Sequence, residues 1–450
     1  MTSVSSELAD FATGLRLDGV PLRTRERAKD LLFDAVGCAV AGHRGEETPQ
    51  IERFVERLGG GGNSTVIGRE LPSDLLGASL LNAYLTTAVT VCDVYVPAHC
   101  HITPEIVPPA MAVAEREGAT GDDLLLAIVT GLEVTSRVAR GLDYPSFRAR
   151  GWHAPGVIGP FGAGAAVGKL LGADLTQMRN ILGLAGSQSA GTWAAWGTPT
   201  VKFHQSRGAA AGLLAGLLGM EGLGSSPDIL AHPDGGILPT YSGGGHASAI
   251  TEGLGEIWEL ERISLRLWPG GTPLQTIITG IRELLDSGWD VAIDDIELVT
   301  VTVAPGVYDA HARFVEPTGT FESLLSIHFV VAVFLQEHGL WLDHTGPDHY
   351  ADPKLRAFQR HRVRLKSDPS LTPTTCRIEI KSDQGVAEVT VEAPKGHPDN
   401  PPARQQLIDK FLRCTSGRLE APEDLAAALL KLEDVRHVSE VTLPMRKVVV

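Results

Sequence analysis

The chain has 450 residues, with 39 basic and 54 acidic side chains and a formal net charge of −15 at pH 7. This length exceeds a single hydrophobic core and predicts two or three domains. The acidic balance argues against nucleic acid as the main partner, because phosphate binding requires concentrated Lys and Arg. No apolar run is long enough to span a bilayer and no signal peptide is recognisable, so we expect no membrane partner. Five scattered cysteines fit a reducing compartment, and we expect a cytoplasmic protein.

The first half of the chain is predicted to be helical. Apolar residues recur at helical spacing in the segments 3–15, 21–41, 73–91, 105–117 and 121–140. The stretch 161–224 is rich in Gly and Ala, and small residues let helix backbones approach closely. Charged residues such as Lys169 and Arg179 interrupt this stretch, which favours a packed globular interior over a membrane span.

The character of the sequence changes near Ile263. Residues 296–303 (IELVTVTV), 376–381 and 386–392 alternate as strands do, and the link 382–385 predicts a hairpin between the last two. Segments 274–287 and 321–337 are predicted helices, and helical patterns return at 405–414 and 423–432. The predicted fold is mainly α with an α+β second domain. A large helical domain (1–262, completed by 396–450) is interrupted by a smaller α+β domain (263–395).

Directly after the apolar helix stands Asp93-Val-Tyr-Val-Pro-Ala-His99-Cys-His101. Two histidines and an aspartate form a conceivable metal triad, but a spacing of two puts His99 and His101 on opposite sides of an extended segment. An ordinary polar loop and an acid–base site are the alternatives. A loop histidine suits acid–base work because its pKa lies near neutrality.

Two further segments carry candidate chemistry. His153 stands between Trp and Ala just before the Gly/Ala-rich stretch, where a structural histidine is the plain alternative. Lys202, His204 and Arg207 precede an apolar helix of small residues. A basic cluster at a helix N-terminus opposes the helix dipole unless an anion is nearby, which suggests a bound carboxylate or phosphate. A solvated basic turn is the alternative.

The order of these motifs resembles the MmgE/PrpD family over nearly the whole chain. The segments that carry the resemblance are Asp34–Gly42, Gly151-Trp-His153 with Gly159-Pro-Phe-Gly-Ala163, Ile181–Gln188, and Pro394–Pro401 with Lys410-Phe411. The resemblance implies a helical domain and an α+β domain with the active site in the cleft between them. It also implies a homodimer, small di- or tricarboxylate substrates, and chemistry without a metal or organic cofactor.

Carried over residue by residue, the resemblance assigns His101 and His153 as the acid–base pair. It makes Lys202 a carboxylate anchor, with His204 in the neighbouring histidine position. The chain also departs from the family pattern. Counting without gaps puts Thr90 at an active-site aspartate, whereas a small gap puts Asp93 there. We therefore take Asp93 as a catalytic candidate and Thr90 as a substrate-binding one.

In the second domain, Arg266 replaces an active-site lysine of the family pattern. An arginine clamps a carboxylate but does not transfer a proton, so we expect Arg266 to bind substrate. The segment 324–329 lacks the family's tyrosine and contains His328 instead.

From the resemblance we expect a lyase that removes or delivers a proton at a carbon next to a carboxylate, followed by dehydration or decarboxylation. An epimerase or isomerase using the same proton abstraction is the alternative. A non-catalytic binding dimer is a third hypothesis, motivated by the altered site residues.

Overall fold

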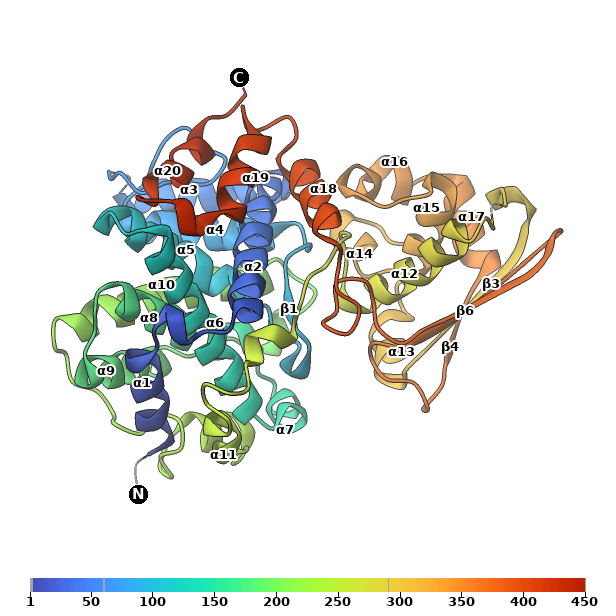
Figure 1. The fold of residues 1–450 in the computed structure, drawn as a ribbon. Helices are drawn as coiled ribbons and strands as arrows, with labels where there is room; N and C mark the ends of the chain where they lie inside the picture. The colour runs from blue at the N-terminus through green and yellow to red at the C-terminus, as the bar shows by residue number, and fades with distance from the viewer. Residues whose placement is uncertain (1–2, 60, 290, 450) are drawn as a thin grey trace. The chain divides into compact units, whose positions relative to one another are not determined.

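The computed structural model describes residues 3–59, 61–289 and 291–449. The chain forms two compact units, one of residues 1–265 with 404–450 and one of residues 266–403. The first is largely helical and the second combines helices with a four-stranded sheet (Figure 1), which confirms the predicted fold class.

The unit boundaries fall later along the chain than the predicted ones at 262/263 and 395/396. At the first boundary, the short strand β2 (Ile263–Ser264) pairs antiparallel with β1 (Val94–Tyr95), which keeps it in the helical unit. At the second, the Asn400 side-chain amide donates to the Ala393 carbonyl (3.0 Å), which ties the turn after the last strand to the α+β unit.

Helices make up most of the first unit. Their bounds are α1 Val4–Gly14, α2 Leu22–Ala41, α3 Thr48–Gly59, α4 Leu75–Ala88, α5 Thr103–Glu117, α6 Gly121–Gly141, α7 Tyr144–Ala149, α8 Ala154–Leu170, α9 Leu175–Gly186, α10 Thr200–Met220, α11 Ala247–Thr251, α18 Arg404–Thr415, α19 Pro422–Leu430 and α20 Ser439–Thr442. The five segments predicted in the first 140 residues all contain helices within a few residues of the expected bounds. None of the helices in the described ranges combines the length and apolarity needed to cross a membrane.

Helix α8 is the centre of the helical unit, where it packs against α5, α6, α9 and α10. The close contact between α8 and α10 requires a glycine at position 212, because a Cβ there would overlap Ala163 and the α8 backbone. The Gly/Ala-rich composition of this stretch is therefore explained by close packing, as predicted. This packing fixes the N-terminal ends of α8 and α10, where His153 and His204 lie.

The second unit is built on a sheet of strand order β4-β3-β5-β6. Strand β3 (Ile296–Val303) is parallel to β4 (Val363–Ser367) and antiparallel to β5 (Cys376–Ser382), which pairs with β6 (Gly385–Val391). The predicted hairpin is confirmed, since Ser382 pairs with Gly385 across a two-residue turn. Strand β4 was not predicted.

Helices α12, α15 and α17 pack against this sheet (Figure 1). The helices of this unit are α12 Thr272–Asp286, α13 Pro305–His311, α14 Thr320–Ser323, α15 Ile327–Glu337, α16 Pro347–Tyr350 and α17 Pro353–Arg362. The continuous helix predicted over 321–337 was wrong. The chain breaks between α14 and α15, because the Ser326 hydroxyl caps α15 by accepting from the backbone N–H of Phe329 (3.0 Å).

Candidate functional site

The segment between α4 and α5 carries Asp93 and His101 in an irregular, fixed conformation. Thr90 and His99 adopt left-handed backbone angles, with φ of 57° and 43°. A β-branched residue such as Thr90 is strained in this region, and strain of this kind persists only where the surroundings impose it. Part of the restraint comes from buried Lys410 of α18, whose ammonium donates to the Val91 carbonyl (2.9 Å) and to the Asp34 carboxylate.

Asp93 is fully buried, and its carboxylate organises the start of α5. It accepts hydrogen bonds from the backbone N–H groups of Ile102 (3.0 Å) and Thr103 (3.2 Å), and from the Thr103 hydroxyl. A carboxylate at a helix N-terminus satisfies N–H groups that have no partner within the helix. These contacts favour a positioning role for Asp93 over the catalytic role expected from the sequence.

His101 is oriented by the same segment. Its Nδ1 lies 2.6 Å from the backbone carbonyl oxygen of Asp93. A carbonyl oxygen only accepts, so Nδ1 carries the proton and Nε2 is the basic nitrogen of the neutral ring. This tautomer is the one that a proton-abstracting histidine needs.

A second pair of histidines lies at the ends of two packed helices. The Nδ1 atoms of His153, which precedes α8, and His204, in the first turns of α10, are 2.9 Å apart. The His153 backbone N–H donates to the Gly191 carbonyl (3.0 Å), which holds the ring in place. Both rings are buried. Fifty-one residues separate them, so this contact is a product of the tertiary fold.

The electrostatics of this region keep the paired rings neutral. Burial lowers the pKa of His153 to about 3, with further contributions from His204, His101 and Arg148. Burial, followed by the charge of Arg207, lowers the pKa of His204 as well. The charge of His101 is among the contributions that lower the pKa of His153, which agrees with the two residues belonging to the same region of the helical unit.

The basic cluster Lys202, His204 and Arg207 does not gather round a common anion position. The Lys202 ammonium pairs with the Glu47 carboxylate (3.2 Å). The Arg207 guanidinium donates to the backbone carbonyls of Gln188, Gly156 and Ala190 at 2.7–2.8 Å. Arg207 therefore fixes the backbone near His153. Lys202 forms an ion pair with the Glu47 carboxylate, and it stays the candidate for binding a substrate carboxylate.

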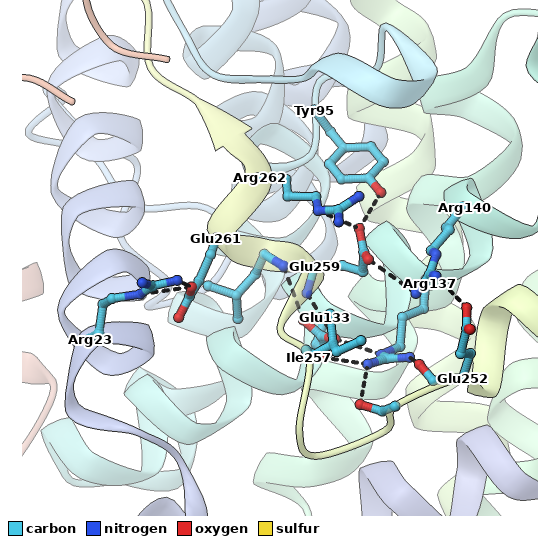
Figure 2. A network of polar contacts seen from close by, with 12 residues as sticks. Arg23, Tyr95, Glu133, Arg137, Arg140, Glu252, Ile257, Glu259, Glu261 and Arg262 are labelled. Atoms are coloured by element: carbon cyan, nitrogen blue, oxygen red, sulfur yellow. Dashed lines mark hydrogen bonds and ion pairs between the residues drawn. The ribbon is translucent and has the colours of Figure 1, made fainter. Parts of the chain in front are cut away.

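A buried ionic network anchors the segment that pairs with β1 (Figure 2). The Arg137 Nε donates to the Glu133 carboxylate (2.6 Å), and its terminal nitrogens donate to the carbonyls of Ile250, Glu252, Gly253 and Ile257. The other Glu133 oxygen accepts from the backbone N–H of Leu260 (3.0 Å).

The network reaches the histidine segment through Tyr95. The Tyr95 hydroxyl donates to Glu259 (2.7 Å), and Glu259 pairs with Arg140 (3.2 Å), as Figure 2 shows. On the other side, Arg23 of α2 pairs with Glu261 (2.9 Å). Tyr95 lies in β1, between Asp93 and His101, so the network fixes the backbone that positions both.

Of the remaining predicted residues, Thr90 lies in the strained turn after α4, as described. Arg266 belongs to the second unit, where it is buried and donates to the Gly270 carbonyl (3.1 Å). His328 is buried near the start of α15, where burial lowers its pKa. The placement of Arg266 and Lys202 as substrate-binding residues stays a prediction.

The sequence reasoning passed over two groups. Glu105, in the first turn of α5, is fully buried, and neither carboxyl oxygen has a hydrogen-bond partner among the described residues. An acidic side chain within an otherwise apolar helix start is the signal that marks it.

In the second unit, Glu337, His344 and His349 place their donor atoms within 4.8 Å of one another, with His349 Nε2 3.4 Å from Glu337. These residue types bind divalent cations. In the alternative metal triad that the sequence offered at Asp93, by contrast, the carboxylate is engaged by the start of α5.

Two family models cover most of the chain. The MmgE/PrpD N-terminal domain matches residues 6–249, and the MmgE/PrpD C-terminal domain matches residues 268–434. The chain belongs to the MmgE/PrpD family. These matches confirm the resemblance on which the site residues were chosen.

Among characterised MmgE/PrpD relatives are cis-aconitate decarboxylases. The protein of that name from Aspergillus terreus is 25% identical over 475 residues, covering 98% of this chain and 96% of the relative. The mouse and human proteins of that name are each 24% identical, with 98% of this chain and 93% and 94% of the relatives covered. The relatives span essentially the same length as this chain, and they support an enzyme of the lyase type.

Proposed function

We propose that the protein is a lyase that acts on a small carboxylic acid by proton transfer at a carbon next to a carboxylate, followed by decarboxylation or dehydration. The observation that carries the proposal is the group of three histidines in the helical unit. His101 is held with its Nε2 as the basic nitrogen, and the His153–His204 pair is kept neutral by burial.

The arrangement supplies what such a reaction needs. A base must take a proton from carbon, and cations must hold carboxylates and stabilise the negative charge that develops. In this proposal His101 is the base, the His153–His204 pair orients the substrate, and Lys202 binds a substrate carboxylate. Arg266 is the proposed second carboxylate anchor, which its bidentate geometry suits.

Decarboxylation is favoured over dehydration because the relatives are cis-aconitate decarboxylases. Because the relatives are only 24–25% identical to this chain, the proposal names a small carboxylic acid as the substrate class rather than cis-aconitate itself. Epimerisation or isomerisation of a small dicarboxylate is the alternative, since it begins with the same proton abstraction. The proposed protein is a homodimer that needs no metal or organic cofactor.

The test is an assay of the purified protein against a panel of di- and tricarboxylic acids that includes cis-aconitate, with products followed by proton NMR. Loss of carbon dioxide or water supports the lyase proposal, and a new stereoisomer without loss of a group supports the alternative. Absence of any product across the panel contradicts the proposal and favours a non-catalytic binding protein. Assaying with and without a chelator tests independence from metal.

A further inference from the structure

Glu105 is an anomaly in the helical unit. Its side chain is fully buried, and among the described residues neither carboxyl oxygen has a hydrogen-bond partner. An unpaired polar group in this environment lowers the free energy of unfolding, and an unpaired buried charge lowers it far more. Such a group in a native protein calls for a specific explanation, and a catalytic role is one of the recognised ones.

The position of Glu105 connects the elements that carry the three histidines. It lies four residues after His101, in the first turn of α5. Its side chain packs against Gly159 of α8 and Gly208 of α10, where an added Cβ would meet the Glu105 side chain. His153 immediately precedes α8, and His204 lies one helical turn before Gly208. Two glycines thus make room for a carboxyl group between these helices.

The charged groups around Glu105 point to a neutral carboxylic acid. Burial, followed by the charge of nearby Asp93, raises the pKa of Glu105 well above its usual range. The buried Cys100 thiol on the same segment donates to the His101 carbonyl (3.0 Å). From α10, His204 is neutral and bonded to His153, and the Arg207 guanidinium is engaged by three backbone carbonyls. The buried carboxylate of Asp93 therefore favours the protonated, neutral form of Glu105.

The proposed reaction needs an acid as well as a base, and the other site residues fill that role poorly. A histidine with a pKa of about 3, such as His153, holds no extra proton near pH 7. An arginine such as Arg266 does not release its proton in proteins. Lys202 is paired with Glu47.

We propose that Glu105 is the proton reserve of this site, a positioning residue that acts through the histidine group. The inference rests on the proposed function. In dehydration, a histidine takes the proton from carbon. Substrate binding brings a Glu105 oxygen within hydrogen-bond distance of the histidine group, and Glu105 then releases its proton through that contact to the departing hydroxyl. The proton on the histidine then returns to the Glu105 carboxylate. In decarboxylation, Glu105 supplies through the same contact the proton that takes the place of carbon dioxide on carbon, and a proton from water then restores the Glu105 carboxylic acid.

The decisive variant is Glu105→Gln, which keeps the shape and neutrality of the side chain but has no acidic proton. We expect kcat to fall at least tenfold with KM changed less than threefold, and the pH profile of kcat to lose the limb that depends on the acid. The control is Glu117→Gln, an exposed glutamate at the end of the same helix, which should match the wild type. A merely structural Glu105 would tolerate glutamine, so unchanged kcat and pH profile in Glu105→Gln would overturn the inference.

Infrared spectroscopy separates this inference from the proposed function. The wild type should show the carbonyl band of a protonated carboxylic acid at neutral pH, and Glu105→Gln should lack that band. If both proteins give the same spectrum, Glu105 is not a neutral acid and the inference fails whatever the activity. A wild type that shows the band but turns over no acid in the panel contradicts the proposed function, and with it the role of Glu105 in turnover.

Discussion

Nδ1 of His153 and Nδ1 of His204 lie 2.9 Å apart, and both rings are buried. A hydrogen bond between two imidazole nitrogens requires one proton between them, so one ring donates and the other accepts. Protonating both nitrogens would place two N–H groups face to face. The pair therefore persists only while at least one ring is neutral, which agrees with the lowered pKa values of both residues.

Replacing either member of the pair should impair turnover while the fold is retained. We expect His153→Ala and His204→Ala each to lower kcat by roughly 100-fold, because the loss of a positioning group misplaces the substrate. The exposed His437→Ala is the control and should keep wild-type activity. Steady-state kinetics with circular dichroism checks this, and full activity in a correctly folded His153→Ala would remove His153 from the mechanism.

The neutral state of His153 predicts that acid weakens folding. In the unfolded chain the histidine pKa is near 6.5, whereas in the folded protein it is about 3. Between these values the unfolded state binds a proton that the folded state does not, so this contribution makes stability fall as pH decreases from 6.5 to 3. The limiting slope is about 1.4 kcal/mol per pH unit. Denaturant titrations across this range should show a shallower pH dependence for His153→Gln, and identical pH dependence would contradict the prediction.

Removing one partner of the Arg137–Glu133 ion pair in the network of Figure 2 should greatly lower the stability of the protein. Arg137→Ala leaves Glu133 buried and unpaired, and breaking a buried ion pair from one side costs about 3–5 kcal/mol. Replacing both partners, as in Arg137→Met with Glu133→Leu, should recover part of this loss because no charge is stranded. Comparing the unfolding midpoints of the single and double variants measures the effect. A single variant as stable as the wild type would show that the pair does not anchor residues 250–260.

Lys202 and Glu47 should have opposite effects on substrate binding. A hydrogen bond to a charged group contributes about 1.5–3 kcal/mol, so Lys202→Ala should raise KM by roughly 10-fold or more. Glu47→Gln removes the carboxylate that competes for the same ammonium and should lower KM. Steady-state kinetics on a substrate found in the panel measures both. A KM raised equally by the two substitutions would indicate that the pair is structural.

Local pattern was enough to predict much of the fold. The bounds of β3 agree with the β-branched sequence of Ile296–Val303, in which Val299, Val301 and Val303 share a face and are buried. Strand β4 escaped prediction, since its sequence, VRLKS, has few apolar residues and its pairing with β3 is parallel and distant in the chain. The break in the helix over 321–337 depends on the cap at Ser326, which the apolar pattern does not reveal.

The candidate site was predicted in its residues but not in its contacts. His101, His153 and His204 were all chosen from sequence, yet the 2.9 Å contact between two of them depends on how α8 and α10 pack. The contacts of Asp93 with the start of α5 and of Arg207 with backbone carbonyls were also not visible in the sequence, and they favour positioning roles, while the catalytic role of Asp93 stays a prediction. The sequence signal for Glu105 was its acidic side chain in the apolar start of α5, but its burial without a partner among the described residues is visible only in the structure.

The most direct test of the central claim, that this histidine group transfers a proton at carbon, is the uptake of solvent deuterium. The wild type, His101→Ala and His437→Ala are incubated in deuterium oxide with a substrate from the panel and examined by proton NMR. The account predicts deuterium at the carbon next to a carboxylate with the wild type and His437→Ala, and none with His101→Ala. Equal incorporation by His101→Ala, or none by the wild type with any acid tested, would contradict it.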